Sequence, residues 1–324
     1  MTVTLEKLKV LFMAEESAPG ICEESGLTAM LVFDAKYAPE FQSEVTNYNL
    51  GVLSKSRYFA NCRRPIMTFS TYIRGSGTAV DDPPHEAMLY KAASLEEIID
   101  TGVSVTYSFT SNKTLWKWLT THFYYKDAGI AYVIKCCGCI ATGVIRCEPC
   151  KPARIDWRLE GIFRGVTTLK DFYDTTTVPA FDATVLNNPQ PPNCMDGGLA
   201  IDSYGVVSNM FEIDFGLELT PRPNFEPAHG HEVPYISDRN TTGTLQMEIP
   251  ADLATELDVQ GSIIDEDVRT FYLHVGAVPN NQYTILLDAQ IINLTESPNG
   301  NIGGWSLSLG ATSEDDTDFS LIFT

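Results

Sequence analysis

The feature that most constrains the fold is a period-two alternation of apolar and polar residues in short segments. Residues 244–249 read Thr-Leu-Gln-Met-Glu-Ile, and residues 305–309 read Trp-Ser-Leu-Ser-Leu. Successive side chains of a β-strand point to opposite faces, so such segments bury one face and expose the other. Similar segments, rich in β-branched and aromatic residues, predict further strands at 66–73, 103–109, 130–134, 155–163, 270–275, 283–294 and 319–323.

Helical signals are confined to two short segments. Residues 84–93 follow an Asp-Pro pair, and residues 251–257 follow Pro250. Proline and acidic residues are favoured where helices begin. We therefore predict a mainly β protein with two short helices.

The order of these predicted elements recurs in the two halves of the 324-residue chain. A strand, a helix, a second strand and a hairpin region are followed in each half by a strand that contains a Trp-x-Leu sequence, at Trp157 and at Trp305. The openings of the halves, 29–34 and 198–202, are also alike. We predict a tandem duplication joined by a linker rich in Pro and Asn. The predicted parts are an N-terminal arm at 1–26, a first β domain at 27–186, the linker at 187–195 and a second β domain at 196–324.

The charge balance excludes one class of function. The chain has 42 acidic and 22 basic residues and a net charge of −20, whereas conventional nucleic-acid binding requires a basic surface. No secretory signal is recognisable, and no apolar run approaches the roughly 20 residues of a membrane span. We expect a protein that is made in the cytoplasm, stays out of membranes and keeps its eight cysteines as thiols.

Three parts of the chain carry a resemblance to a known family. They are residues 7–16 with 29–34 and 49–51; the Gly-rich loop and helix start at 75–89 with the strand at 154–163; and the segments 237–243, 304–309, 314–316 and 319–323. Together they resemble the major tail proteins, or tail-tube proteins, of long-tailed bacteriophages with non-contractile tails. The cysteine-rich segment 136–150 departs from the family pattern.

The resemblance implies tail-tube β-sandwich domains, each with a flanking helix, whose strands join a barrel around a central channel. Rings of such subunits stack into the tube through which DNA leaves the virion. Three copies of a duplicated chain would form a pseudo-sixfold ring, and six copies would form a hexamer. The implied partners are other copies of the chain, tail proteins such as the tape measure and the terminator, and genomic DNA that passes without specific binding. The implied location is the virion tail, assembled in the host cytoplasm, with no cofactor.

Acidic residues follow the alternation in the second half. Residues 211–218 predict a single strand with apolar residues on one face and Glu212, Asp214 and Glu218 on the other, and Glu248 is placed similarly in 244–249. Like charges repel, so an acidic wall would keep DNA from adhering during passage. We predict that these four acids face the channel. The alternative is a solvent-facing side of an antiparallel sheet.

The strongest sequence signal for a different kind of site, a metal site, is a pair of Cys-x-x-Cys motifs. Cys136, Cys139, Cys147 and Cys150 could surround zinc if both pairs lay at the base of a hairpin. The alternative is that 132–136 and 140–147 form two adjacent strands in which the cysteines pack as small apolar residues. The His-Gly-His sequence at 229–231 lacks the i, i+4 spacing of helical zinc sites and is expected in an exposed loop. We predict no metal and no catalytic residue.

A glycan-binding module is the alternative function. The aromatic residues of 116–118 and 123–125 could stack on sugars, as in a two-domain β-sandwich lectin or adhesin, or they could pack inside the sheet. Two long segments, 50–64 and 173–193, are expected to be exposed in the free chain and to become ordered on stacking. Ordering costs about 1–2 kcal/mol per residue.

Overall fold

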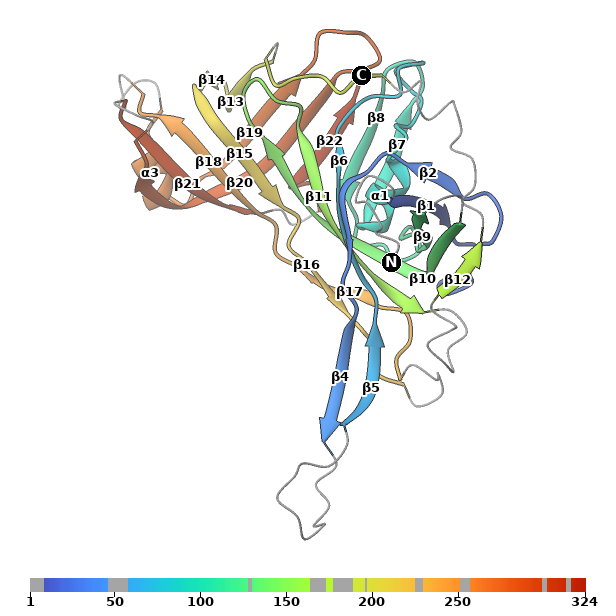
Figure 1. Ribbon diagram of the computed structural model, residues 1–324. Helices are drawn as coiled ribbons and strands as arrows, with labels where there is room; N and C mark the ends of the chain where they lie inside the picture. The colour runs from blue at the N-terminus through green and yellow to red at the C-terminus, as the bar shows by residue number, and fades with distance from the viewer. Residues whose placement is uncertain are drawn as a thin grey trace.

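The computed structural model describes residues 9–45, 58–127, 130–163, 173–176, 189–195, 197–224, 230–250, 257–298, 302–312 and 316–324. Within these ranges the chain is mainly β, as predicted, and two short helices accompany the strands (Figure 1). Eighteen of the described strands join one antiparallel hydrogen-bonded network, and two hairpins stand apart from it. Neither described helix has the length and hydropathy that a membrane crossing requires.

The elements of the first half are β1 (Lys9–Glu15), β2 (Thr28–Met30), β3 (Phe33–Tyr37), β4 (Glu40–Val45), β5 (Tyr58–Arg64), β6 (Ile66–Tyr72), α1 (Ala87–Ala92), β7 (Leu95–Asp100), β8 (Ser104–Phe109), β9 (Leu119–Asp127), β10 (Ile130–Cys147), β11 (Arg154–Phe163) and β12 (Tyr173–Thr176). Those of the second half are β13 (Leu199–Ile201), β14 (Tyr204–Gly205), β15 (Ser208–Asp214), β16 (Leu217–Thr220), β17 (Tyr235–Arg239), β18 (Thr242–Glu248), α3 (Val259–Ile264), β19 (Val268–Val275), β20 (Tyr283–Glu296), β21 (Gly304–Ala311) and β22 (Phe319–Phe323).

The strand pairing of the first half recurs in the second. The first half contains the pairing series β2–β1–β9–β10–β11–β6–β3. The second contains β14–β13–β19–β20–β21–β18–β15. An eighth strand pairs with the long strand of each series, β12 with β10 and β22 with β20. A separate hairpin also recurs in the chain order, β4–β5 between β3 and β6 and β16–β17 between β15 and β18. The β7–β8 hairpin has no counterpart in the described second half.

This pairing changes two of the predicted equivalences. Residues 103–109, which form β8, were expected to match 270–275 of β19. However, β19 pairs with β20 as β9 pairs with β10, so β9 is the counterpart of β19, and β8 belongs to the additional β7–β8 hairpin. The opening 198–202 was expected to match 29–34, but β13 pairs with β19 as β1 pairs with β9. Sequence order alone misaligned the halves because the β7–β8 hairpin adds two strands to the first. The predicted domain boundaries stay predictions.

One sheet nevertheless runs through both halves. The end of β10, Val144–Cys147, pairs with Phe211–Asp214 of β15, and β22 pairs with β8. In Figure 1 the strands of the second half, yellow to red, continue from the green strands β10 and β11. The described part of the predicted linker lies against the β10–β11 turn, where the Cys194 N–H donates to the Lys151 carbonyl at 2.9 Å.

The core also draws on both halves. Tyr90 of α1 is fully buried and lies 4.8 Å from the ring of Tyr107 and 6.0 Å from that of Phe323, measured between ring centroids. Phe215 lies 6.0 Å from Trp157 and belongs to the same buried cluster. Shared burial of large aromatic rings is a major stabilising contribution, so the halves fold onto a common interior.

Two predicted strand assignments are wrong. Residues 211–218 form parts of two strands in different sheets, because Gly216 has a φ of +61° and turns the chain between β15 and β16. Residues 132–136 and 140–147 form one strand, β10, with a register shift near Gly138. Gly138 has a φ of +58°, and an added Cβ would lie 2.2 Å from Val233 Cγ1. A glycine bulge therefore lets β10 continue where two strands were expected.

The predicted helix at 84–93 is confirmed as the shorter α1, Ala87–Ala92. The second predicted helix, 251–257, lies almost wholly outside the described residues, and α3 begins after it. The Asp258 side chain accepts a hydrogen bond from the Gly261 N–H at 2.7 Å and so caps the start of α3.

Candidate assembly surface

One side of the sheet carries mainly polar residues from strands of both halves. Along β18, side chains alternate strictly between buried and half-buried, and β11 and β15 follow much the same pattern. We call this side the polar face. It comprises Thr68, Ser70, Thr142, Arg146, Asp156, Arg158, Glu212, Asp214, Thr244, Gln246, Glu248, Ser306 and Ser308.

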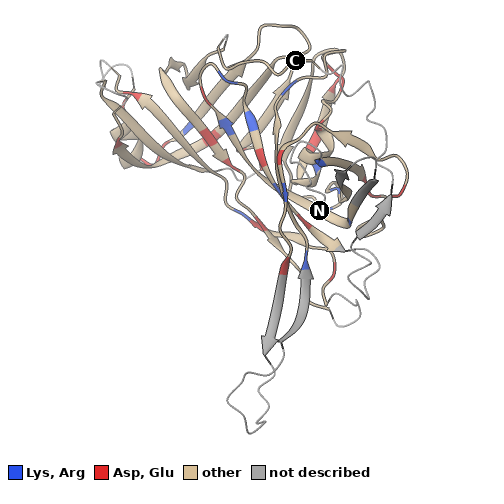
Figure 2. Ribbon diagram, in the orientation of Figure 1, with Lys and Arg blue, Asp and Glu red and all other residues tan. Residues whose placement is uncertain are grey.

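Basic and acidic side chains pair where the two halves join on this face. Arg146 of β10 donates from Nε to Asp156 Oδ2 at 2.8 Å and from Nη1 to Glu212 of β15. Arg154 Nε lies 3.4 Å from Asp156 Oδ1, which also accepts from Ser70 Oγ at 2.6 Å. Figure 2 shows the resulting bands of blue and red across the middle of the sheet. The junction is therefore charge-balanced.

The four predicted channel acids lie in three settings. Glu212 pairs with Arg146, so its charge is neutralised locally. Asp214 is exposed on the polar face and accepts from the Gly216 N–H at 2.9 Å, while Glu248 is half-buried at the end of β18. Glu218 is exposed, but it lies on the separate β16–β17 hairpin. The expected single acidic strand is thus divided by the turn at Gly216, and the orientation of these acids toward a channel stays a prediction.

The β4–β5 hairpin extends away from the rest of the molecule (Figure 1). Arg64, at its base, forms an ion pair with the buried Glu160 of β11 and donates to the Leu219 carbonyl of β16 at 3.0 Å. Burial raises the pKa of Glu160, and the Arg64 and Arg158 guanidiniums oppose that shift. Arg64 therefore anchors the bases of both separate hairpins to the sheet.

The two segments predicted to become ordered on stacking are partly strands. Residues 58–64 form β5, and residues 173–176 form β12, which pairs with β10. The remaining parts, 50–57 and most of 177–193, lie outside the described residues except for 189–193.

The four cysteines considered as zinc ligands are not brought together. They lie on or just after one continuous strand, and an extended strand rises about 3.3 Å per residue, which holds Cys139 and Cys147 roughly 26 Å apart. Cys136, Cys139 and Cys147 are buried, whereas Cys150 is exposed. Burial raises the pKa of the Cys139 thiol to about 12, which disfavours the thiolate that zinc requires. In the part of the chain that the structure describes, no group of three or more His, Cys, Asp or Glu side chains is placed to hold a metal.

The expectation that all cysteines are thiols is wrong for two of them. Cys22 and Cys137 form a disulfide across 115 residues of sequence. Next to it, the buried Glu16 carboxylate accepts hydrogen bonds from the Gly138 N–H at 2.6 Å and the Gly20 N–H at 2.7 Å. Burial raises the pKa of Glu16, and these hydrogen bonds oppose the shift. The loop after β1 is thereby fixed to the bulge of β10.

The aromatic residues considered for glycan stacking are largely buried. Trp116 is 9% exposed and donates from Nε1 to the Thr110 carbonyl at 2.9 Å, and Phe123 and Tyr124 are buried. Their ring faces are therefore occupied by packing. His229 lies outside the described residues, and His231 is buried rather than exposed, with a ring nitrogen 3.1 Å from the Glu232 carbonyl.

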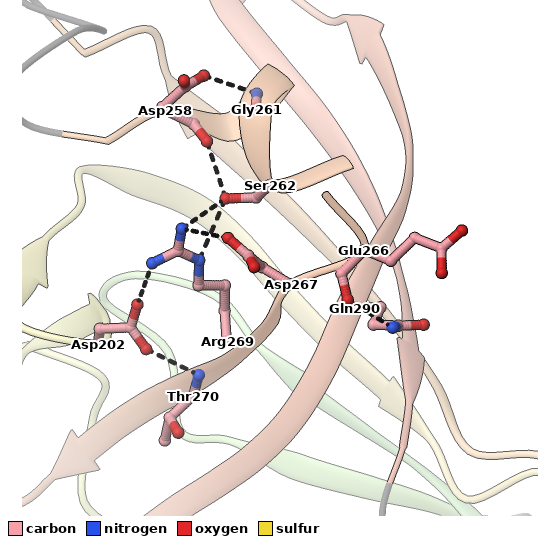
Figure 3. Close-up of polar contacts among 9 residues, drawn as sticks. All are labelled: Asp202, Asp258, Gly261, Ser262, Glu266, Asp267, Arg269, Thr270 and Gln290. Carbon is pink, nitrogen blue, oxygen red and sulfur yellow. Dashed lines mark hydrogen bonds and ion pairs between the residues drawn. The ribbon is translucent and has the colours of Figure 1, made fainter. Parts of the chain in front are cut away.

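A second polar cluster fixes α3 at the far end of the second half (Figure 3). The Arg269 guanidinium lies 3.0 Å from carboxylate oxygens of Asp202 and Asp267 and donates to Ser262 Oγ at 2.8 Å and 3.1 Å. Asp202 also accepts from the Thr270 N–H at 3.0 Å. One arginine thus ties α3 and the β13–β14 turn to β19, which indicates a structural role for these acids.

No protein-family model matches this chain, and no curated protein shows significant similarity to it.

Proposed function

We propose that the chain is a self-assembling structural protein without catalytic activity, the tail-tube subunit of a long-tailed, non-contractile bacteriophage. The observation that carries this proposal is the recurring strand pairing, in which one repeat adds its sheet directly to the next through β10 and β15. The strand pairing that joins the two repeats within one chain can also join one chain to the next. Head-to-tail contacts of this kind between identical chains close into a ring when the rotation between neighbours permits.

In this proposal each chain supplies two tube-like β domains. Three copies then form a pseudo-sixfold ring, and stacked rings form the tube in the virion tail after assembly in the host cytoplasm. The projecting β4–β5 hairpin is suited to contact the next ring, because it stands clear of the sheet. The tape measure, the terminator and other copies of the chain are the expected partners.

The polar face is assigned to the channel. Its ion pairs and hydroxyl groups offer DNA no net basic surface, and the net charge of −20 for the chain repels a polyanion. DNA would then pass without specific binding.

Electron microscopy of the purified chain in negative stain tests the proposed function. Tubes, or rings with three-fold symmetry, are expected at high protein concentration or in the presence of the other tail proteins. Six chains per ring would retain the function but reject the duplicated arrangement. A chain that stays monomeric under all these conditions, or that binds glycans as a monomer, contradicts the proposal.

Charge reversal on the polar face tests its assignment to the channel. Asp214→Lys combined with Glu248→Lys is expected to leave tube formation intact and to slow DNA ejection several-fold, because cations in the bore attract phosphate. Glu212 is unsuitable, since its loss would remove one of the two carboxylates that pair with Arg146. Ejection kinetics from virions that carry the variant provide the measurement.

The matched control is Glu96→Lys with Asp100→Lys, which changes the charge equally on β7, a strand that carries none of the residues of the polar face. Normal ejection through well-formed tubes of the Asp214 and Glu248 variant would remove this face from the channel wall.

A further inference from the structure

The junction between the halves is a complete strand pairing. The end of β10 pairs with β15 in antiparallel register, and the Phe215 N–H donates to the Gly143 carbonyl at 3.0 Å. Ile145 and Ile213 face each other at full burial, while Arg146 and Glu212 pair on the polar face. Main-chain bonds, apolar packing and an ion pair therefore all contribute to this junction.

The strands equivalent to β10 and β15 at the two ends of the repeat lack such a partner among the described strands. β3 is the counterpart of β15, and it pairs with β6 on one side alone among the described strands. β20 is the counterpart of β10, and β19 covers it only as far as Gln290. Beyond that point, Ile292 is 62% exposed, and Asn293, Thr295 and Glu296 are also exposed. Among the described residues, the repeat thus has at each end an edge that no strand covers, although α3 packs against β20, where its interior has a closed junction.

The main-chain groups at both edges point outward. The Ala38 N–H donates to the Ile66 carbonyl of β6, so after the register shift of β3 the alternating pattern turns the N–H and C=O groups of Tyr37 away from β6. Just after β20, the Ser297 N–H donates to the Gly304 carbonyl of β21. The alternating pattern therefore turns the main-chain N–H and C=O groups of Leu294 and Glu296 away from β21.

Side chains cover part of these edges. Lys9 Nζ donates to the Ala35 carbonyl at 3.3 Å, and the Leu294 N–H donates to Asn293 Oδ1 at 2.9 Å. Such contacts protect an edge strand, and a pairing strand can replace them.

We propose that the end of β20 in one copy pairs antiparallel with β3 of the next copy and so repeats the β10–β15 junction between chains. This inference rests on the proposed function and adds the identity of the two contacting strands. Lys36 would take the place of Glu212, because each lies opposite a threonine of the adjacent strand, Thr68 or Thr244. The sheet and its polar face would then run without interruption around the ring.

Cysteine cross-linking tests the contact. Lys36, Asn293 and Thr295 are all exposed, so replacing them should leave the fold intact. Lys36→Cys is combined with Thr295→Cys, or with Asn293→Cys to sample a register two residues away, and assembled tubes are oxidised with a copper catalyst and oxygen. Non-reducing electrophoresis is expected to show a ladder at multiples of the 35.8 kDa chain for at least one double variant. The single variants and the parent chain, which retain the native cysteines, control for other disulfides.

A proline at the edge gives an independent test. Glu296→Pro removes an N–H that points away from β21, so the free chain should keep its thermal midpoint while tube assembly falls at least ten-fold. Ile99→Pro on β7, another edge strand, is the matched control and should still assemble.

The outcomes separate the two proposals. Tubes of the parent chain together with no ladder in either double variant, or with normal assembly of Glu296→Pro, would overturn the β20–β3 contact and leave the tube function standing. Failure of the parent chain to form any ring or tube would reject the function itself, and the contact with it.

Discussion

Replacing Arg74 with alanine is expected to lower the free energy of unfolding by about 3–5 kcal/mol, because it leaves a buried carboxylate without its partner. Glu86 is fully buried, and its Oε1 accepts from Arg74 Nε at 3.1 Å and from Nη2 at 2.5 Å. Arg74 is itself 7% exposed. The pair joins the end of β6 to the start of α1, so it fixes the helix that carries Tyr90 into the shared core.

Urea denaturation followed by fluorescence measures this loss. The matched control is Arg154→Ala, which removes an arginine from a partly exposed ion pair with Asp156, and which should cost about 0–1 kcal/mol. Replacing both members of the buried pair, by Arg74→Met with Glu86→Leu, should restore part of the stability because no charge is left unpaired. Equal losses for Arg74→Ala and Arg154→Ala would show that the buried pair is not a principal contact of α1.

The elements that could be predicted are those in which one side of a strand is buried and the other is not. β18 and β21 alternate in sequence and in burial, so their period identifies both the strand and its inner face. β7 was missed because its sequence, Leu-Glu-Glu-Ile-Ile-Asp, does not alternate, and Ile98 and Ile99 are about half exposed. Burial of one side of a strand is the physical cause of the apolar–polar alternation, so a strand that is not buried on one side does not show it.

Pairing partners could not be predicted in the same way. Periodicity specifies the faces of a strand but not its neighbours, so nothing local links Arg146 to Glu212 across 66 residues. The order of elements did indicate a repeat, yet it misaligned the halves at β8. The acids of 211–218 were assigned to one strand because Gly216 was counted as an ordinary member of the alternation. Its positive φ is a property of the tertiary structure.

Loss of the Cys22–Cys137 disulfide is expected to destabilise the chain by about 2–5 kcal/mol. The cross-link closes a long loop, with a sequence separation of 115, and a long loop in the unfolded chain loses much conformational entropy when it is closed. The bond also joins the loop after β1 to the bulge in β10, where Val233 packs close to Gly138. Its loss should therefore affect the first half more than β18–β21, which pair with one another and not with β1 or β10.

Chemical denaturation with and without a reductant provides the measurement, and the intact mass of the oxidised chain should be two hydrogens lighter than that of the reduced chain. Cys22→Ser with Cys137→Ser should have the stability of the reduced parent and should not respond to reductant. Cys150→Ser, which replaces an exposed free thiol, is the control and should leave the oxidised midpoint unchanged. An oxidised and a reduced parent with the same midpoint would show that Glu16, through its hydrogen bonds to Gly20 and Gly138, is sufficient to hold this loop.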